Sequence, residues 1–174
     1  MLRSLFEWVD AMPNSIAMRE SLNGYPIALT LHVVSMGLVA GIIVYWDLRL
    51  AGMALKRVPV SKIQTRLFPW AFLGLVISIG SGLFMVYSQP MRYYPNFYFW
   101  IKNALLLFAA VNALYFHLTI YKTVEEWEHD PVTPLAARMA GVASLALWAG
   151  IIATGRLIAY SGLVPDWWIG LGLG

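Results

Sequence analysis

Apolar residues run along this chain in four long blocks that carry few charges or none. The blocks lie at about residues 26–46, 67–88, 97–121 and 139–161. Roughly 20 mostly apolar residues are enough for a helix to cross a bilayer, and helices satisfy their own backbone hydrogen bonds over such a length. The pattern therefore predicts an all-α integral membrane four-helix bundle, with residues 1–174 forming a single membrane domain.

The residues before the first block follow a different pattern. Apolar side chains fall on one helical face and charged ones elsewhere; the apolar set is Leu2, Leu5, Phe6 and Val9, and the charged set is Arg3, Glu7 and Asp10. An amphipathic segment of this kind is typical of a helix lying in the membrane interface. Pro13 follows it closely and should break the helix. We therefore expect a short N-terminal interfacial helix.

Small residues and prolines refine the predicted helices. Gly37 and Gly41 form a GxxxG pair, and the second block carries Gly74, Ser78 and Gly82 four residues apart. Such faces let helix backbones approach closely in membranes, so we expect helix–helix contacts at both. Pro26 and Pro69 are expected in the first turns of their helices, where proline is tolerated.

Composition narrows the function classes. The chain is 60% hydrophobic and 12% charged, whereas soluble domains are about a quarter charged. It has no cysteine, which excludes disulfides, iron–sulfur clusters and thiol catalysis. No glycine-rich phosphate loop, HExxH motif or intramembrane carboxylate pair occurs. We therefore expect no catalytic activity of the chain's own.

The basic residues predict an orientation. Seven of them lie at or near the first and third connections, namely Arg49, Lys56, Arg57, Lys62, Arg66, Lys122 and Arg138. Three lie on the opposite side, namely Arg3, Arg19 and Arg92. Because cytoplasmic loops carry the excess of Lys and Arg, both termini should be non-cytoplasmic. Because the basic residues lie at the ends of the spans and not on a soluble face, we interpret them as determinants of membrane orientation and expect no nucleic-acid partner.

Ionisable residues inside the predicted spans mark candidate sites, because they are costly in lipid. At 1.5 Å per residue, His32, Lys102 and Arg156 lie about 6, 10 and 9 Å to the outer side of their span midpoints. Met85 stands at a similar level. His117 lies about 12 Å to the inner side of its own midpoint. The spans therefore predict one polar layer in each leaflet.

Haem b fits the outer layer. Helical bundles hold haem through an axial histidine, so His32 is the first candidate ligand and Met85 a candidate sixth ligand. Lys102 and Arg156 would face the propionates. His117 is a second candidate ligand, for a haem in the inner layer.

One iron cannot take both histidines. Their depths differ by about 18 Å, whereas two axial nitrogens lie only about 4 Å apart. Three alternatives are left: one haem in the outer layer, one haem in the inner layer, or one in each. In the inner site the sixth ligand would be Met139, or the sixth coordination position would have no protein ligand.

The residues also allow functions without haem. His32 could bond across helices to a hydroxyl, or serve a quinone carbonyl together with Arg156 and Tyr160. At the inner end of the first span, Arg49 is expected to anchor to lipid headgroups while Asp47 finds a partner on a neighbouring helix.

The leading hypothesis is a b-type haem protein of electron transfer, or an accessory subunit of a membrane redox complex. The alternative is a quinone-binding or small-solute transport helper subunit without haem. Partners would be the lipid bilayer, a quinone or redox protein, and a homo-oligomer or larger membrane complex.

Several segments resemble an uncharacterised bacterial family of small four-helix inner-membrane proteins. These are YPIALTLHVVSMGLVAGIIVYWDLRLAG, YPNFYFWIKNALLLFAAVNALYFH and ATGRLIAYSG. More distantly, the chain is similar to membrane b-type cytochromes and copper-resistance membrane proteins. The resemblance implies a bacterial inner (plasma) membrane location and, through the distant similarity, haem. The residues that carry over are His32, Asp47, Arg49, Lys102, Asn112, His117 and Arg156.

Overall fold

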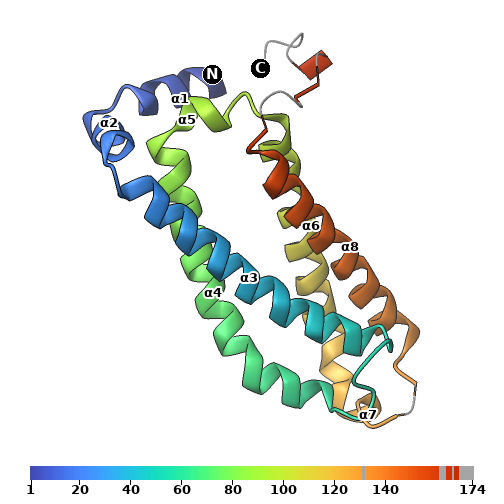
Figure 1. Cartoon of the computed structure of the whole chain (residues 1–174). Coiled ribbons are helices and arrows are strands. Elements are labelled where there is room, and N and C mark those ends of the chain that lie inside the picture. Colours follow the sequence, from blue (N-terminus) through green and yellow to red (C-terminus); the bar gives the residue numbers. More distant parts are fainter. Residues whose placement is uncertain (131, 161–163, 166, 169–174) are drawn as a thin grey trace. The chain divides into compact units, whose positions relative to one another are not determined.

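The structure is a computed structural model that describes residues 1–130, 132–160, 164–165 and 167–168, and these contain no strand (Figure 1). In chain order the elements are α1 (Leu2–Asp10), α2 (Pro13–Glu20), α3 (Gly24–Leu50), α4 (Val60–Ser88), α5 (Pro90–Tyr93), α6 (Phe97–Tyr115), the π-helical turn η1 (Phe116–Ile120), the 3₁₀ turn η2 (Tyr121–Thr123), α7 (Val124–Trp127) and α8 (Leu135–Leu157). The predicted all-α fold class is confirmed.

Four helical stretches are long and apolar enough to cross a membrane: Gly24–Leu50, Val60–Ser88, Phe97–Trp127 and Leu135–Leu157. They contain most of the four apolar blocks and continue beyond several of their ends, since backbone hydrogen bonding does not stop where polar side chains begin.

The helix ends differ from the sequence expectations at two places, and the expected position of Pro69 was wrong. Pro69 lies well inside α4 rather than in its first turn, because the helix begins early, at Val60, and includes the charged residues before the apolar block. The fourth helix ends at Leu157, where the amide of Tyr160 turns back to the Leu157 carbonyl. The expected last residue, Ser161, lies outside the described residues.

The helices contribute to two compact units. The first consists of Met1–Gly37, Gly74–Ile101 and Thr154–Gly174, and the second of Leu38–Leu73 and Lys102–Ala153. Each long helix therefore supplies residues to both units.

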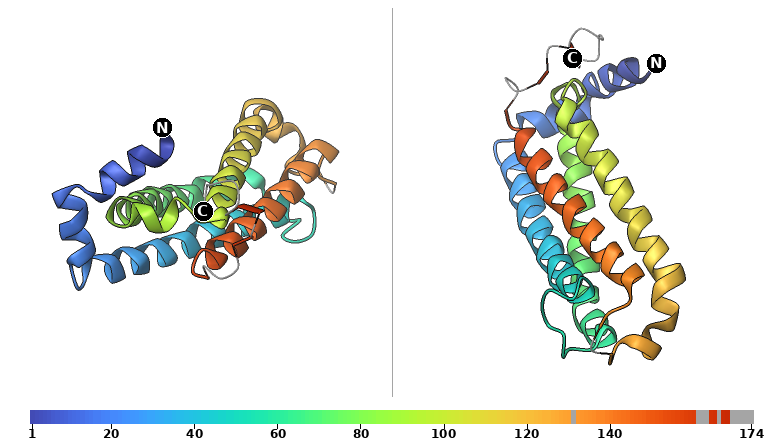
Figure 2. Two further views of the ribbon diagram at one scale, coloured as in Figure 1. Left: turned by 90° about the horizontal axis from the view of Figure 1, so that it is seen from above. Right: turned by 90° about the vertical axis from the view of Figure 1, so that its right-hand side faces the viewer.

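In the first unit, α1 lies beside α5 (Figures 1 and 2), and the Phe6 ring centroid is 6.3 Å from that of Trp100 near the start of α6. The Phe6 ring packs on Tyr94, with centroids 5.0 Å apart. The predicted N-terminal helix thus forms, and Leu2, Leu5 and Trp8 stay at least half exposed. These exposed side chains are what an interfacial helix needs, and its place in the interface stays a prediction.

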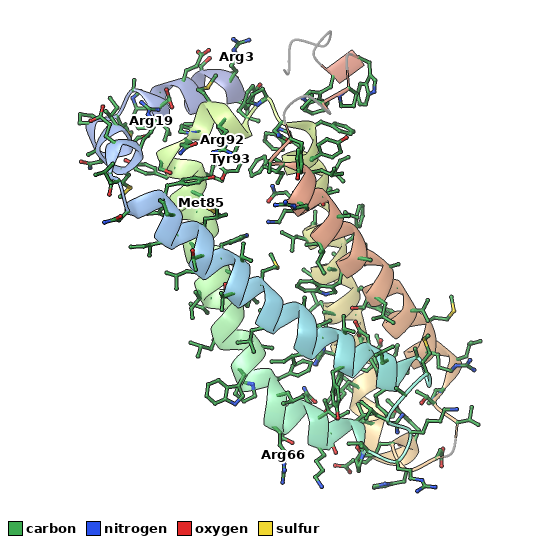
Figure 3. All side chains as sticks on the ribbon, in the orientation of Figure 1. Arg3, Arg19, Arg66, Met85, Arg92 and Tyr93 are labelled. Atoms are coloured by element: carbon green, nitrogen blue, oxygen red, sulfur yellow. The ribbon has the colours of Figure 1, made fainter. Side chains whose placement is uncertain are left out.

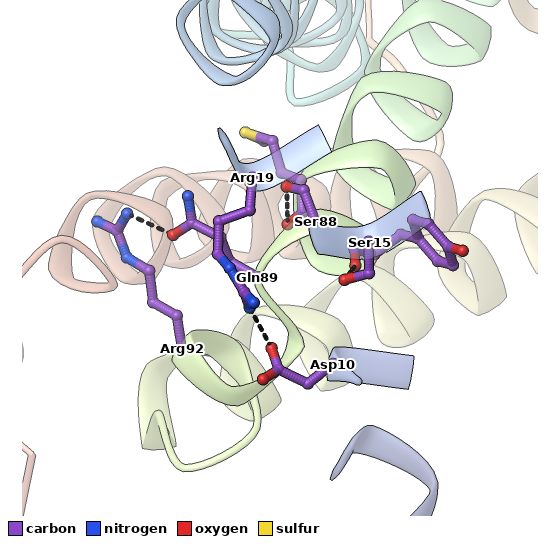
Figure 4. Close-up of polar contacts among 8 residues, drawn as sticks. Asp10, Ser15, Arg19, Ser88, Gln89 and Arg92 are labelled. Carbon is purple, nitrogen blue, oxygen red and sulfur yellow. Dashed lines mark hydrogen bonds and ion pairs between the residues drawn. The ribbon is translucent and has the colours of Figure 1, made fainter. Parts of the chain in front are cut away.

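Polar contacts join α2 to the end of α4 and order the adjacent turns (Figure 4). The fully buried Ser15 hydroxyl donates to the Tyr87 carbonyl at 2.8 Å. Arg19 binds Asp10 at 2.7 Å, linking α2 back to α1. These contacts fix the two short helices against the start of the second connection.

The buried centre of the first unit is apolar. Ala28, Met85 and Tyr93 form it, and Figure 3 shows Met85 and Tyr93 near the junction of α4 and α5. The Tyr93 hydroxyl lies 2.9 Å from the Tyr25 hydroxyl. Burial, aided by that neighbouring hydroxyl, raises the pKa of Tyr93. Asn96 then caps α6 by accepting the Tyr98 amide at 3.0 Å.

The second unit has a larger core. Its buried members come from α3, α4, η1, α7 and α8: Trp46, Leu50, Val60, Ile63, Phe116, Val124, Trp127, Ala137 and Ala140. Trp46 stacks at a tilt on Phe68, with centroids 4.8 Å apart. Asn112 of α6 donates to the Ala140 carbonyl of α8 at 3.1 Å. The apolar centre and the hydrogen bond from Asn112 thus help to hold these segments together.

Gly141 and Gly82 lie close to a neighbouring helix, whereas the GxxxG pair of Gly37 and Gly41 does not. A methyl group added at Gly141 would lie 2.9 Å from both the Asp47 carbonyl oxygen and the Leu50 Cβ, so α8 meets the backbone of α3 there. At Gly82 it would lie 3.2 Å from the His32 ring. At Gly37 and Gly41 it would have no such atom within 4 Å. The expected close contact at Gly37 and Gly41 was wrong, since that face of α3 is exposed.

Candidate functional site

His32 is held by the second membrane-length helix. Its Nδ1 lies 2.9 Å from the carbonyl oxygen of Ser78 and 3.3 Å from the Ser81 hydroxyl, and both serines are buried. Because a carbonyl can only accept, this contact places the ring proton on Nδ1. In the neutral imidazole the other nitrogen, Nε2, then carries the lone pair. The absence of a side chain at Gly82 lets the ring pack this closely against α4.

The other residues predicted for the outer layer have separate surroundings. Met85 is buried in the apolar cluster with Ala28 and Tyr93. Arg156 is exposed and bonds the Tyr160 hydroxyl at 3.2 Å, with its guanidinium 5.5 Å from the centre of the same ring. Lys102 is half-buried and belongs to the second unit, whereas His32 belongs to the first. The common depth of these groups stays a prediction.

His117 is the predicted inner-layer candidate. Its Nδ1 lies 2.9 Å from the Ala113 carbonyl, so this ring is also protonated there, and its Nε2 lies 3.2 Å from the Gln64 amide nitrogen. Gln64 thus donates to the nitrogen that a metal would need. Rings of Phe68, Phe116 and Tyr121 surround the imidazole at 5.4 to 6.1 Å between centroids.

The backbone departs from α-helix at this histidine. Phe116–Ile120 forms a π-helical turn. Such turns are rare in proteins, and many of those that occur lie at functional sites. The turn carries the buried Phe116 ring into the core and His117 to its edge. His117 is therefore a locally ordered imidazole whose Nε2 already has a hydrogen-bond donor.

Asp47 is buried, with 3% of its surface exposed, and its carboxyl bonds the Ser144 hydroxyl of α8. The expected partner on a neighbouring helix is therefore present. The second carboxyl oxygen, Oδ2, has no hydrogen-bond partner among the described residues.

Arg49 is buried as well, with 2% exposed, which corrects the expectation that it anchors to headgroups. Its guanidinium donates to three acceptors: the Val58 carbonyl at 2.7 Å, the Thr133 hydroxyl at 3.0 Å and the Glu128 carbonyl at 3.0 Å. The planar guanidinium, with its fixed donor directions, suits such a three-way contact. The connections after α3 and before α8 thus close over this side chain.

Glu128 and Thr133 were not singled out from the sequence. The Glu128 carboxylate accepts the Ser61 amide at 3.0 Å, and the exposed His129 lies 3.8 Å from its other oxygen. Burial alone would raise the pKa of Glu128, but the hydrogen bonds from Ser61 and the charges of His129 and Arg49 together lower it. An acidic loop gives no sign in sequence of which carboxylate will be held.

The pKa of Glu128 predicts an acid-sensitive contribution to stability. A lowered folded-state pKa stabilises the protein above the unfolded value of about 4.5, and the contribution is lost as pH falls through the folded value. In Glu128→Gln this contribution should be missing. Melting curves in detergent between pH 3 and 7 should therefore show the wild type above the variant near neutrality and the two converging in acid. A constant difference would show that the carboxylate charge plays no part.

Among the described residues, no group of three or more His, Asp or Glu side chains is arranged to hold a metal ion.

Comparison with known proteins gives a family and no activity. No curated protein and no solved structure matches the chain. A family model described as a family of unknown function (DUF6644) matches residues 6–161 of the 174. The match includes both candidate histidines, the Asp47 and Arg49 pair and Arg156. The chain belongs to this family of unknown function, DUF6644.

Proposed function

We propose that the chain is an integral membrane b-type haem-binding protein, acting in electron transfer or as an accessory subunit of a membrane redox complex. The observation that carries the proposal is the setting of His32. Its Nδ1–H is directed to the Ser78 carbonyl, and a backbone carbonyl on one ring nitrogen is the usual way in which proteins orient the other nitrogen toward a metal. Haem, when bound, supplies reversible one-electron chemistry.

Several residues of this chain would together hold the haem. His32 is the proposed axial ligand, and Ser78 and Ser81 fix its ring. Met85 is the candidate sixth ligand and Arg156 the candidate propionate partner, and both belong to the same unit as His32. The role expected for Lys102, which belongs to the other unit, stays a prediction from the sequence. His117 is the second ligand candidate, and Gln64 donates to its Nε2.

Removal of the ligand tests the proposal. His32→Ala should abolish the Soret band of the haem-supplied protein or shift it strongly, since the iron loses its axial nitrogen. His129→Ala is the matched control, because its side chain is 74% exposed, and His117→Ala should also retain the band. If His32→Ala keeps the wild-type spectrum, His32 is not the ligand.

We further propose a bacterial inner membrane location with both termini on the non-cytoplasmic side. The excess of Lys and Arg in the first and third connections supports this orientation. Reporter fusions after Lys62 and after Glu126 should both read as cytoplasmic. An external reading at either point would contradict the orientation.

A further inference from the structure

A basic hollow lies in the second unit, beside the buried Arg49 and apart from either histidine's contacts. It measures about 230 Å³ and is lined by Arg49, Gly52, Lys56, Val132, Thr133 and Arg138. A water molecule occupies roughly 30 Å³ in the liquid, so the hollow has room for a group of several heavy atoms.

The shape of the hollow follows from the end of α3. Gly52 has a φ of +71°, a left-handed conformation that glycine adopts without strain. The amides of Met53 and Ala54 turn back to the Leu48 carbonyl at 3.0 and 3.2 Å. This turn satisfies a terminal helix carbonyl and brings Lys56 to the same hollow as Arg49.

Three cationic side chains meet there without a carboxylate partner. Among the described residues, none of Arg49, Lys56 and Arg138 has a carboxylate oxygen within 4 Å. Glu128 faces Arg49 with its backbone carbonyl, while its carboxylate accepts the Ser61 amide. The residues that line the hollow thus include three cations and no carboxylate, while the nearby Glu128 carboxylate offsets part of the Arg49 charge.

Arg49 is also poised to bind a further acceptor. A guanidinium has five N–H groups, and three hydrogen bonds to protein atoms hold this one in place. Thr133 accepts one of them through its hydroxyl oxygen, which leaves its own O–H able to donate. A fixed guanidinium, a hydroxyl and two exposed cations at the rim are the donors that a phosphate group takes.

We propose that this hollow binds a phosphate group, carried either by an anionic phospholipid headgroup or by a soluble phosphate compound. Arg49 and Thr133 bind the phosphate oxygens from the buried side, and Lys56 and Arg138 bind them from the exposed side. The positive-inside orientation places these connections on the cytoplasmic face, where both sources occur.

The test uses the full-length protein in a non-ionic detergent at fixed ionic strength. Melting temperature is followed during titration with inorganic phosphate, with short-chain phosphatidylglycerol and with short-chain phosphatidylcholine, a zwitterionic lipid without net charge. We expect saturable stabilisation by inorganic phosphate, by phosphatidylglycerol or by both. Phosphatidylglycerol alone would identify a headgroup site, and inorganic phosphate would identify a site open to soluble compounds.

Variants at the rim keep the test independent of folding. The double variant Lys56→Gln/Arg138→Gln removes two exposed cations and leaves the Arg49 hydrogen bonds intact. At roughly fivefold per cation, the midpoint of the titration should rise about 25-fold. Arg66→Gln/Lys122→Gln removes two exposed cations elsewhere in the same unit and should leave the midpoint unchanged. The proposal is overturned if neither anion gives saturable stabilisation, or if both double variants shift the midpoint equally.

Discussion

Arg49→Met should destabilise the protein by about 3 kcal/mol or more, because it leaves two buried acceptors and one partly buried acceptor without their donor. Each unsatisfied buried group costs about 1–3 kcal/mol, and the Val58 and Glu128 carbonyls and the Thr133 hydroxyl all lose the guanidinium. For a domain of this size the melting temperature should fall by roughly 10 °C. Thermal unfolding of the purified protein in detergent measures the effect.

Arg66→Met is the control for the loss of a cation. Arg66 lies on α4 and is exposed. The melting temperature of the Arg66→Met protein should therefore stay within about 2 °C of that of the wild type, as for an ordinary surface substitution. Arg49→Lys should fall between the two, since an ammonium keeps the charge but cannot reproduce the planar set of donors. Equal melting temperatures for Arg49→Met and Arg66→Met would show that the three hydrogen bonds do not stabilise the fold.

Gly141→Ala should destabilise the contact between α8 and α3 by about 1–3 kcal/mol, as overpacking does in a well-packed interior. The new methyl group would lie 2.9 Å from the Asp47 carbonyl oxygen and 3.1 Å from the Ala51 amide nitrogen. Both are backbone atoms, so the clash is relieved only by moving one helix away from the other.

Gly41→Ala separates the clash from the general effect of replacing glycine. Its added methyl group has no such atom within 4 Å, and alanine favours the helix by up to about 1 kcal/mol. Gly41→Ala should therefore melt at or slightly above the wild-type temperature, while Gly141→Ala melts several degrees lower. A loss of stability in Gly41→Ala would restore the GxxxG pair as a packing site, against the exposed α3 face seen here.

The fold class could be predicted because the length of an apolar block is set by the bilayer. Four such blocks gave four long helices, and the amphipathic start gave α1. The same reasoning failed for Pro69, since α4 begins within the charged segment, directly after Pro59 and well before the apolar block. Likewise, GxxxG spacing indicates that two helix backbones could approach each other closely. Which glycine lies against a neighbouring helix depends on how each helix is rotated about its own axis.

The polar sites were predicted only in part, for a related reason. His32 and Asp47 could be singled out because an ionisable side chain within an apolar block needs a partner. The partners themselves, Ser78 and Ser144, are common residues far along the chain. Arg49 was misplaced at the headgroups because Glu128 and Thr133, which enclose it, come from a connection 79 and 84 residues away. Contacts over such separations are set by the fold and leave no local signal.

Haem binding is tested most directly by the absorption spectrum of the purified wild-type protein, recorded as isolated and again after haem is supplied and excess removed. We predict a Soret band that stays with the protein through gel filtration in detergent and shifts on reduction. A wild-type protein with no Soret absorbance after haem has been supplied would contradict the proposed function, and a quinone-binding or small-solute helper subunit would take its place.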